Sequence, residues 1–502
     1  MSLQGYNAAG ALIDSNLSAG RGAKLAFIDD AGSMTYAQLA ERIDRVANAL
    51  LAMGIQREER IGIAMLDCCD WPALFLGAIK AGIVPVAMNT LLTPSDYDYQ
   101  LRDSRAKALF VSEPLLKSFE RLKCPHLKHV IPALRLSELL AKAPAKAEAA
   151  ATTADDMCFW LYSSGSTGSP KGTVHLHSHL IVTADLYAKP ILGIRESDVV
   201  FSAAKLFFAY GLGNALTFPM SVGATAVLMA ERPTPDAVFK RLVEKKPTIF
   251  YGVPTLYAAL LASPSFPSKA DLRVRICTSA GEALPKNLAE RWTEKTGTEI
   301  LDGIGSTEML HIFISNRSGE ARYGTTGKPV PGYEVRLVDE QGNVVTEPGE
   351  MGELQVSGPS SAIMYWNQRE KTKNTFQGPW TRSGDKYTFD ADGYYTHGGR
   401  SDDMLKVSGI YVSPVEVEAA LISHESVLEA AVVGAEDENK LVKPKAYVVL
   451  KSGQSPNEKL KVALQQHVKS KLAPHKYPRW IEFASELPKT ATGKIQRFKL
   501  RT

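Results

Sequence analysis

Cysteine is scarce in this sequence. The chain has 502 residues but only five cysteines, and none stands at a metal-binding spacing. A low and odd count is typical of free thiols in a reducing compartment and argues against a disulfide framework. We therefore expect a cytoplasmic protein whose cysteines are free: Cys68, Cys69, Cys124, Cys158 and Cys277.

A membrane-spanning or exported segment is also missing. The N-terminus, MSLQGYN, lacks the basic-then-apolar order of a signal peptide. The most apolar long stretch, residues 71–92, contains Lys80 and Pro85 and is broken by Gly82, so it predicts a core helix followed by a strand. The chain does not end in Ser-Lys-Leu, the peroxisomal signal. We expect no membrane partner.

An excess of charge of one sign is absent as well. The sequence has 58 Lys and Arg residues and 54 Asp and Glu residues, which gives a net charge of +4. The basic residues are mixed with acidic ones and form no tract. A nucleic-acid partner is therefore not expected, whereas a local site for phosphate is compatible with this balance.

Strand-like and helical patterns alternate through the first two-thirds of the chain. This alternation predicts an α/β architecture with parallel sheets that are covered by helices. The predicted strands are 60–65, 83–88, 108–111, 157–161, 199–201, 224–229, 249–252 and 274–279, and the predicted helices are 35–53, 73–81, 234–245 and 255–261. The Ala/Lys/Glu run at 141–151 is expected to be a solvated linker or helix.

The pattern changes after about residue 325. Segments 333–339, 352–357 and 394–397 are apolar runs between Gly, Pro and Asn turns, which predicts a β-rich subdomain. The last part of the chain alternates again, with helices expected at 414–423 and 457–471 and strands at 427–433 and 443–450. We therefore predict a large N-terminal domain, made of two α/β subdomains plus a β-rich subdomain, and a small C-terminal α/β domain.

A loop rich in glycine and hydroxyl side chains runs from Tyr162 to Gly172, with the sequence YSSGSTGSPKG. Glycines let backbone N–H groups close on phosphate oxygens, hydroxyls add donors, and a lysine adds a positive charge. The loop is not a Walker A motif, because Pro170 precedes Lys171 and no Ser or Thr follows it directly. It predicts a phosphate site formed by Ser164, Gly165, Ser166, Thr167, Gly168 and Lys171.

The loop resembles the phosphate loop of the adenylate-forming superfamily, which contains acyl- and aryl-CoA ligases, peptide-synthetase adenylation domains and firefly-type luciferases. The resemblance covers nearly the whole chain, because further motifs follow in the family's order. They are DGIGSTE at 302–308, RSGD at 382–385, GRSDDMLKVSG at 399–409 and PKTATGK at 488–494. The resemblance implies activation of a carboxylic acid with ATP to form an acyl-adenylate.

The resemblance also implies how ATP is held. Glu308 would hold Mg²⁺, a cation that prefers oxygen ligands, and Thr307 would donate to the α-phosphate. Asp385 would accept hydrogen bonds from the ribose hydroxyls, assisted by Arg400. The adenine would be framed by Asp302, Gly303, Ile304, Gly281, Glu282 and Ala283. Because Ile304 stands where the family usually has an aromatic residue, apolar contact would replace stacking there.

Lys494 is the catalytic cation that the resemblance implies. The substrate carboxylate and the α-phosphate are both anionic, and one positive charge between them lowers their repulsion and stabilises the pentavalent transition state. The resemblance divides the chain into domains at 1–401 and 402–502, with a hinge at Asp402 about which the small domain rotates. Gly409 would then line a tunnel for the pantetheine arm of coenzyme A.

Residues 203–213, AAKLFFAYGLG, stand where the family builds its acyl site. Amino-acid-activating relatives have an aspartate after an aromatic residue there, but this chain has Ala209 after Phe208, so a buried ammonium would lack a partner. Many acyl- and aryl-CoA ligases have histidine in place of Phe208. Together with residues 308–313, this run resembles benzoate-CoA ligases, which implies an aromatic ring among Ala209, Tyr210, Ala280, Gly305, His311 and Ile312.

Two histidine questions stay open at this point. His311 is either a polar residue at the rim of the ring site, where it would help bind a hydroxyl-substituted substrate, or a satisfied core histidine. His175, His177 and His179 alternate, which on one strand would align three imidazoles and suggest zinc. Because no Cys, Asp or Glu lies within this run, packing beneath the phosphate site is the preferred interpretation.

The resulting hypothesis is an AMP-forming aryl-CoA ligase that uses ATP, Mg²⁺ and coenzyme A to convert benzoate to benzoyl-CoA through benzoyl-AMP. No carrier domain is expected after Lys494, so free coenzyme A is the expected acceptor, with Lys476 and Arg479 as candidates for its phosphates. The alternatives are a 4-hydroxybenzoate- or other substituted-arylcarboxylate-CoA ligase, a stand-alone aryl adenylation enzyme that loads a carrier protein, and an inactive nucleotide-binding protein. A monomer or homodimer is expected.

Overall fold

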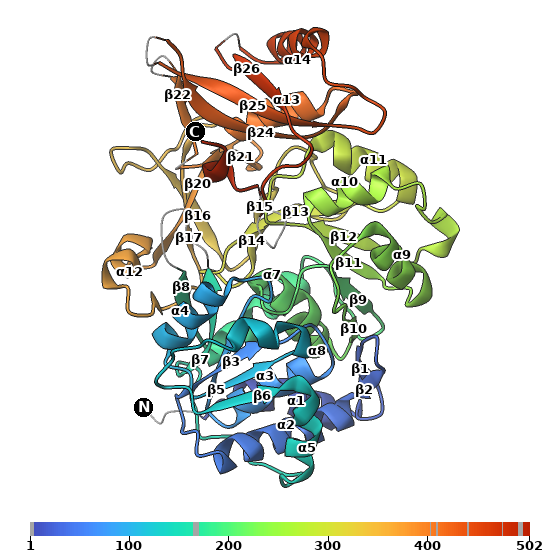
Figure 1. Ribbon diagram of the computed structural model, residues 1–502, viewed down its shortest axis with the longest axis vertical. Helices are drawn as coiled ribbons and strands as arrows, with labels where there is room; N and C mark the ends of the chain where they lie inside the picture. Colours follow the sequence, from blue (N-terminus) through green and yellow to red (C-terminus); the bar gives the residue numbers. More distant parts are fainter. Residues whose placement is uncertain are drawn as a thin grey trace.

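A computed structural model describes residues 5–163, 170–401, 403–407, 410–438, 441–473, 475–489 and 495–501. In this part of the chain a large N-terminal domain carries a small C-terminal domain at one end (Figure 1). The large domain contains two extended sheets and a β-rich part. The predicted mixed α/β architecture is therefore confirmed.

The first sheet has the strand order β18-β8-β7-β4-β3-β5-β6. Strands β3, β4, β5, β6 and β7 pair in parallel, as the continuous apolar runs of all but β6 predict, and β8 and β18 add antiparallel to one edge. The bounds are β3 Arg60–Ala64, β4 Val84–Ala87, β5 Ala108–Val111, β6 His129–Pro132, β7 Met157–Ser163, β8 Lys171–Leu176 and β18 Met364–Tyr365.

Helices α2 (Tyr36–Ala52) and α3 (Asp70–Lys80) pack closely against each other beside this sheet. Gly77 makes the approach feasible, because a Cβ at this position would lie 2.5 Å from the side chain of Val46. Thr35 caps α2 by accepting from Gln38 N, while the Gln38 side chain returns to Thr35 N. The predicted helices 35–53 and 73–81 are thus confirmed, with α3 beginning three residues earlier than predicted.

The second sheet has the order β15-β14-β13-β12-β11-β9-β10-β1-β2. Its centre, from β13 to β1, is parallel, and antiparallel strands complete both edges. The bounds are β1 Leu25–Ile28, β2 Ser33–Thr35, β9 Val199–Ser202, β10 Thr225–Val227, β11 Ile249–Gly252, β12 Ile276–Ser279, β13 Ile300–Gly305, β14 Ile312–Ser315 and β15 Lys328–Pro329. Helices α9 (Pro235–Glu244), α10 (Pro254–Ala262) and α11 (Lys286–Thr296) cover one face around Phe250 and Trp292.

The β-rich part of the large domain is an antiparallel sheet in the order β16-β17-β20-β19, with β21 also paired to β20. Its strands are β16 Glu334–Val338, β17 Gly352–Ser357, β19 Phe376–Gln377, β20 Trp380–Phe389 and β21 Tyr395–Arg400. The three strands predicted after residue 325 correspond to β16, β17 and β21, and β20 was not predicted.

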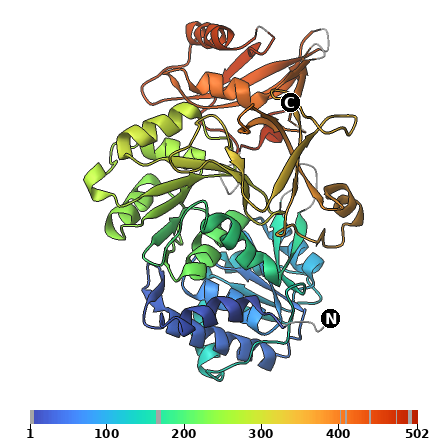
Figure 2. The ribbon, with the colours of Figure 1, turned by 180° about the vertical axis from the view of Figure 1, so that it is seen from behind.

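The small domain has a core of its own, centred on Val412, Val432 and Leu464. It contains the hairpin β22 (Leu405–Val407) and β23 (Ile410–Val412) and a sheet of β24 (Val427–Glu436), β25 (Val442–Leu450) and β26 (Trp480–Phe483). Helices α13 (Pro414–Ile422) and α14 (Glu458–Lys471) belong to the same domain. Seen from both sides, the C-terminal end lies where the small domain meets the β-rich part (Figures 1 and 2).

Shorter helices connect these layers. They are α1 Ala8–Ser18, α4 Pro94–Ser104, α5 Leu136–Ala141, α6 His177–Thr183, α7 Ala209–Leu212, α8 Phe218–Val222 and α12 Arg369–Thr375, with the helical turns η1 Glu113–Phe119, η2 Ala133–Arg135, η3 Ala184–Ala188, η4 Gly213–Thr217, η5 Lys269–Asp271 and η6 Arg497–Leu500. The run at 141–151 is a linker, because α5 ends where it begins. The five cysteines are free. Within the described ranges, no helix is long and apolar enough to cross a membrane.

Candidate active site

The predicted site residues gather where parallel strands of the second sheet end. Residues 280–283 follow β12 directly, and Asp302, Gly303, Ile304 and Gly305 form the end of β13. Ligands of open α/β sheets bind outside the carboxyl ends of the strands, because the loops that follow adjacent parallel strands meet there. Gly281 has a φ of +94°, a conformation that glycine adopts easily and that turns the chain away from β12.

The residues predicted to surround an aromatic ring form one apolar cluster. Ala209 and Tyr210 begin α7, Gly305 is the register partner of Ile312 across the β13–β14 hairpin, and Ala280 belongs to the same core. The Tyr210 hydroxyl lies 2.6 Å from Thr278 Oγ1, and its ring centroid lies 5.5 Å from that of His311. The structure therefore brings these six residues together, although they come from four separate segments.

His311 lies inside this cluster and not at an exposed rim, since it is only 2% exposed. Its Nε2 donates to Asn214 Oδ1 at 3.1 Å, so Nδ1 carries the lone pair when the ring is neutral. Burial lowers the pKa of His311 to about 3, which keeps it neutral. Nδ1 has no hydrogen-bond partner among the described residues, so His311 is only partly satisfied.

A cation, a phenol and a carboxylate meet beside the predicted phosphate loop. The Tyr365 hydroxyl donates to Glu308 Oε1 at 2.6 Å, and Lys171 Nζ lies 3.2 Å from the same hydroxyl and 3.8 Å from Glu308 Oε1. Burial, followed by the charge of Glu308, raises the pKa of Tyr365, so the phenol stays protonated. Tyr365 was not predicted from the sequence, because it belongs to the two-residue strand β18 and gives no local pattern.

Two of the carboxylates predicted to bind the nucleotide, Asp302 and Asp385, differ in their surroundings. Asp302 is buried, and its Oδ1 has no hydrogen-bond partner within the described part of the chain. Burial raises the pKa of Asp302 well above its ordinary value. Asp385 on β20 lies 3.3 Å from His397 Nε2 and 3.4 Å from Arg400 Nη1. The predicted pair Asp385 and Arg400 is therefore brought together on adjacent strands.

The three alternating histidines do not share one strand face. Strand β8 ends at Leu176 and α6 begins at His177, so the strand-based alignment was wrong. His175 Nε2 donates to the Thr307 carbonyl at 2.8 Å, and His179 Nδ1 lies 3.1 Å from His175 Nδ1. In the described ranges, no group of three His, Cys, Asp or Glu residues could hold a metal. His175 thus supports the segment that carries Thr307, which agrees with packing beneath the site.

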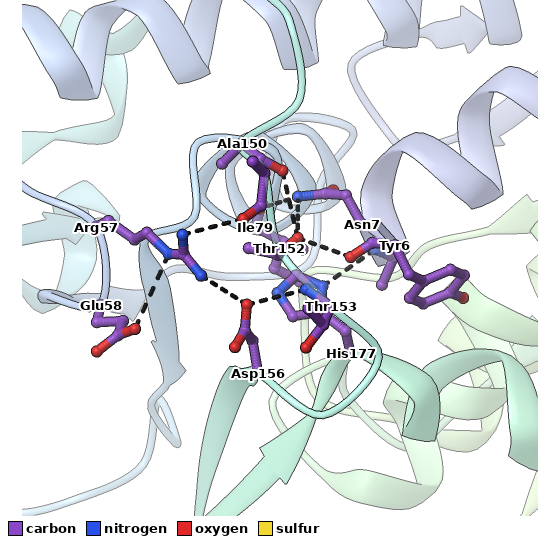
Figure 3. A network of polar contacts seen from close by, with 12 residues as sticks. Tyr6, Asn7, Arg57, Glu58, Ile79, Ala150, Thr152, Thr153, Asp156 and His177 are labelled. Atoms are coloured by element: carbon purple, nitrogen blue, oxygen red, sulfur yellow. Dashed lines mark hydrogen bonds and ion pairs between the residues drawn. The ribbon is translucent and has the colours of Figure 1, made fainter. Parts of the chain in front are cut away.

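His177 belongs to a different network, which joins the N-terminal segment to the first sheet (Figure 3). Its Nδ1 accepts from Ala8 N at 3.1 Å. Asn7 donates to the Ile79 carbonyl at 2.9 Å, and Arg57 pairs with Asp156 at 2.6 Å. Because Nδ1 must accept this bond, a neutral imidazole at position 177 is part of the folded structure.

The small domain reaches the site through the residues that follow Lys494. Ile495 N donates to Glu282 Oε1 at 3.1 Å, across the boundary between the two domains. The predicted residues Ser164, Gly165, Ser166, Thr167, Gly168, Asp402, Gly409 and Lys494 lie outside the described residues. Of the two candidates for coenzyme A phosphates, Lys476 pairs with Glu416 at 2.6 Å, and Arg479 lies over the Tyr477 ring.

Buried neutral histidines make the fold sensitive to acid. Burial lowers the pKa values of His175 and His177 to about 4 and those of His179 and His311 to about 3. Below pH 6.5 the unfolded chain binds protons that the folded chain does not, so stability falls as pH drops from 6.5 toward 4. Each histidine accounts for roughly 2 kcal/mol at pH 5. Asp67 opposes this trend, because burial raises its pKa to about 6.

We therefore expect the free energy of unfolding, measured in urea, to be several kcal/mol smaller at pH 5 than at pH 7. A His311→Phe variant keeps an aromatic ring but cannot be protonated. Its loss of unfolding free energy between pH 7 and pH 5 should be smaller than that of the unchanged protein by roughly 2 kcal/mol, the contribution of one histidine. Equal stability of the unchanged protein at pH 7 and pH 5 would contradict the assignment of neutral buried histidines.

Comparisons with known proteins agree with this geometry. The family described as AMP-binding enzyme matches residues 16–366, and its C-terminal domain matches residues 416–494. The chain is 64% identical to the benzoate–CoA ligase of Thauera aromatica, over 99% of this chain and 96% of the relative. It is 51% identical to a 4-hydroxybenzoate–CoA/benzoate–CoA ligase of Rhodopseudomonas palustris, over 100% of this chain and 95% of that relative. The solved structure of a benzoate CoA ligase from Burkholderia xenovorans LB400 superimposes with a TM-score of 0.94 at 58% identity, over 99% of this chain and 100% of that structure's chain.

Proposed function

We propose, since this chain belongs to the family of AMP-binding enzymes, that it is an AMP-forming ligase that joins benzoate to coenzyme A. In the first step a carboxylate oxygen forms a bond to the α-phosphorus of ATP, and pyrophosphate leaves. In the second step the thiol sulfur of coenzyme A forms a bond to the acyl carbon, the proton leaves the sulfur, and AMP departs. The full-length identity with the benzoate–CoA ligase supports this assignment.

The β13–β14 hairpin is the observation that carries the proposal. Gly305 at its start and His311 and Ile312 at its end are predicted to line the ring. Thr307 and Glu308, the predicted contacts of the α-phosphate and Mg²⁺, lie between them in the chain. An acid whose ring lies against Tyr210 and His311 would direct its carboxylate toward the predicted phosphate contacts. Because His311 is neutral and Ala209 is apolar, this cluster suits an uncharged ring and gives no partner to a substrate ammonium.

Mg²⁺ fits the residues at Glu308. This cation is commonly held by one or two carboxylates together with substrate phosphates. Glu308 offers one carboxylate, and its side chain is 15% exposed beside Lys171. The phosphates of ATP would supply further oxygen ligands. When bound, Mg²⁺ would offset the negative charge of the phosphates. Asp385 would hold the ribose, and the turn at 280–283 would hold the adenine.

The small domain is proposed to rotate about Asp402, within a division of the chain at 1–401 and 402–502. In one orientation it brings Lys494 to the anionic reactants, and in the other it presents Gly409 to the pantetheine arm. Coenzyme A is the proposed acceptor. The free thiols fit a cytoplasmic location, and a monomer or homodimer is the proposed state.

A second substrate, 4-hydroxybenzoate, is favoured by one observation. His311 Nδ1 is a buried acceptor without a partner in the described part of the chain, and a phenolic hydroxyl would donate to it. The 51% identical relative is named for both acids. We expect 4-hydroxybenzoate to be turned over, with benzoate preferred.

The proposed function is tested with a panel of benzoates and short fatty acids, assayed for pyrophosphate release with and without coenzyme A. With benzoate and ATP but no coenzyme A, we expect release of about one pyrophosphate per enzyme molecule. When coenzyme A is added, release should continue with each turnover. Accumulation of aroyl-AMP without a thioester would instead indicate an enzyme that loads a separate carrier protein. Release of pyrophosphate with fatty acids but not with benzoates would overturn the choice of substrate.

A further inference from the structure

The segment at residues 495–501 touches both domains. The side chains of Ile495 and Leu500 pack on the small domain, against the cluster of Ala431, Val449 and Leu487. The backbone N–H of Ile495 points the other way and donates to Glu282 Oε1 of the large domain at 3.1 Å. Ile495 directly follows Lys494 in the chain. One carboxylate of the large domain therefore holds the residue next to the predicted catalytic lysine.

The same segment is anchored to the small domain by Arg497. The guanidinium contacts Glu418 through two bonds, of 2.9 Å from Nε and 2.7 Å from Nη2, and its Nη1 lies 3.4 Å from Asp403. Burial alone would lower the pKa of Arg497, but Glu418 and, to a lesser extent, Asp403 and Glu282 raise it. Arg497 thus moves with the small domain, whereas Glu282 belongs to the turn that follows β12.

Glu282 lies between the ring cluster and the predicted nucleotide residue Asp302. Its turn begins one residue after Ala280 of the ring cluster, and the backbone of Leu284 in the same turn contacts Asp302. A hydrogen bond to a charged acceptor is stronger than one between neutral groups. It also holds Ile495 against the large domain, and Ile495 is adjacent in the sequence to Lys494.

We propose that Glu282 is a positioning residue that docks the 495–501 segment onto the large domain and so favours the domain orientation needed for formation of the acyl-adenylate. The proposal rests on the proposed function, because it assumes that Lys494 acts between two anions in the first step. The second step brings no second anion to the α-phosphate, since the thiol attacks an acyl carbon. The docking contact of Glu282 with Ile495 is therefore needed for the first step and dispensable for the second.

The test measures the two steps separately in the full-length protein. Single-turnover formation of benzoyl-AMP from benzoate and ATP reports the first step, and conversion of supplied benzoyl-AMP by coenzyme A reports the second. We expect Glu282→Ala to slow the first step about 10- to 100-fold, the range that follows from loss of one hydrogen bond to a charged group. The second step should stay within about twofold.

Two further variants separate docking from other roles. Glu282→Gln keeps an oxygen that can accept from Ile495 N, so it should recover most of the first-step rate. Glu290→Ala is the matched control, because Glu290 lies on the neighbouring helix α11 with a side chain that is 54% exposed, and it should change neither step. Ile495→Pro removes the donor of the same bond and should reproduce the effect of Glu282→Ala.

The outcomes are distinct. Equal slowing of both steps, with weaker binding of ATP in a titration, would mean that Glu282 only frames the adenine and would overturn the proposal. An unchanged first step in Glu282→Ala would overturn it as well. If the unchanged protein makes no adenylate from any aromatic acid, the proposed function fails before Glu282 is tested. Slowing of the first step alone, with ATP affinity retained, supports docking.

Discussion

Replacing Lys494 with alanine is expected to slow formation of benzoyl-AMP by about a hundred- to a thousand-fold, the usual cost of removing one preorganised charge-stabilising group. The reason is electrostatic, because a carboxylate must approach an anionic α-phosphate, and the lysine is the predicted cation between them. The measurement is single-turnover release of pyrophosphate at saturating ATP and benzoate. Conversion of supplied benzoyl-AMP to benzoyl-CoA should be nearly unaffected.

The matched control is Lys489→Ala, in the same PKTATGK motif. Lys489 pairs with Glu429 of β24 at 2.6 Å, and its side chain is 30% exposed, so its charge is directed into the small domain. This variant should adenylate at close to the normal rate. A Lys494→Ala protein that kept its full adenylation rate would remove Lys494 from the catalytic role and leave the cation of the first step unassigned.

Replacing Arg497 with alanine is expected to destabilise the small domain by about 3–5 kcal/mol, the range for breaking a buried ion pair. The Glu418 side chain is only 8% exposed, so it would keep a buried charge whose remaining hydrogen-bond partner among the described residues is Val432 N. Hydrogen exchange of amides in α13 and β24 would report the loss, since both elements contact this pair. Amides of the first sheet should exchange at their normal rates.

Two variants make this stability prediction specific. The double variant Arg497→Met with Glu418→Leu removes both charges and should recover most of the protection, since paired apolar replacements of buried ion pairs are often neutral or stabilising. Lys461→Ala breaks an exposed pair with Glu458, whose side chain is 84% exposed, and should change stability by less than about 1 kcal/mol. Equal effects of Arg497→Ala and Lys461→Ala would contradict the role of the buried pair.

Local sequence patterns predicted most of the parallel strands, but they did not predict β1, β6 or β13. The predicted ranges of β5 and β11 agree with the structure at both ends, because short β-branched and aromatic runs between turns have few alternatives. The histidine run shows where such reasoning fails. The period of two over 175–179 left one shared strand face open as an alternative, but β8 ends at Leu176, and His175 and His177 have separate partners, the Thr307 carbonyl and Ala8 N.

The site residues were located by motif, but their contacts could not be predicted from sequence. Tyr365 reaches Glu308 because β18 pairs with the edge of the first sheet, a long-range pairing that no local pattern encodes. The contact of Ile495 with Glu282 likewise depends on how two domains are oriented. Asp302 and Glu282 illustrate the part that topology supplies, because adjacent parallel strands carry them to the same edge of the sheet.

The antiparallel pairing of β18 with β8 also has a consequence for how the chain folds as it is synthesised. Met364 pairs with Val174, so this edge of the first sheet stays open until a much later segment has left the ribosome. At ordinary elongation rates the delay is roughly 10–40 s. An open strand edge is a template for intermolecular pairing. Newly made chains therefore pass through an interval in which binding of the β8 edge by a chaperone would limit aggregation.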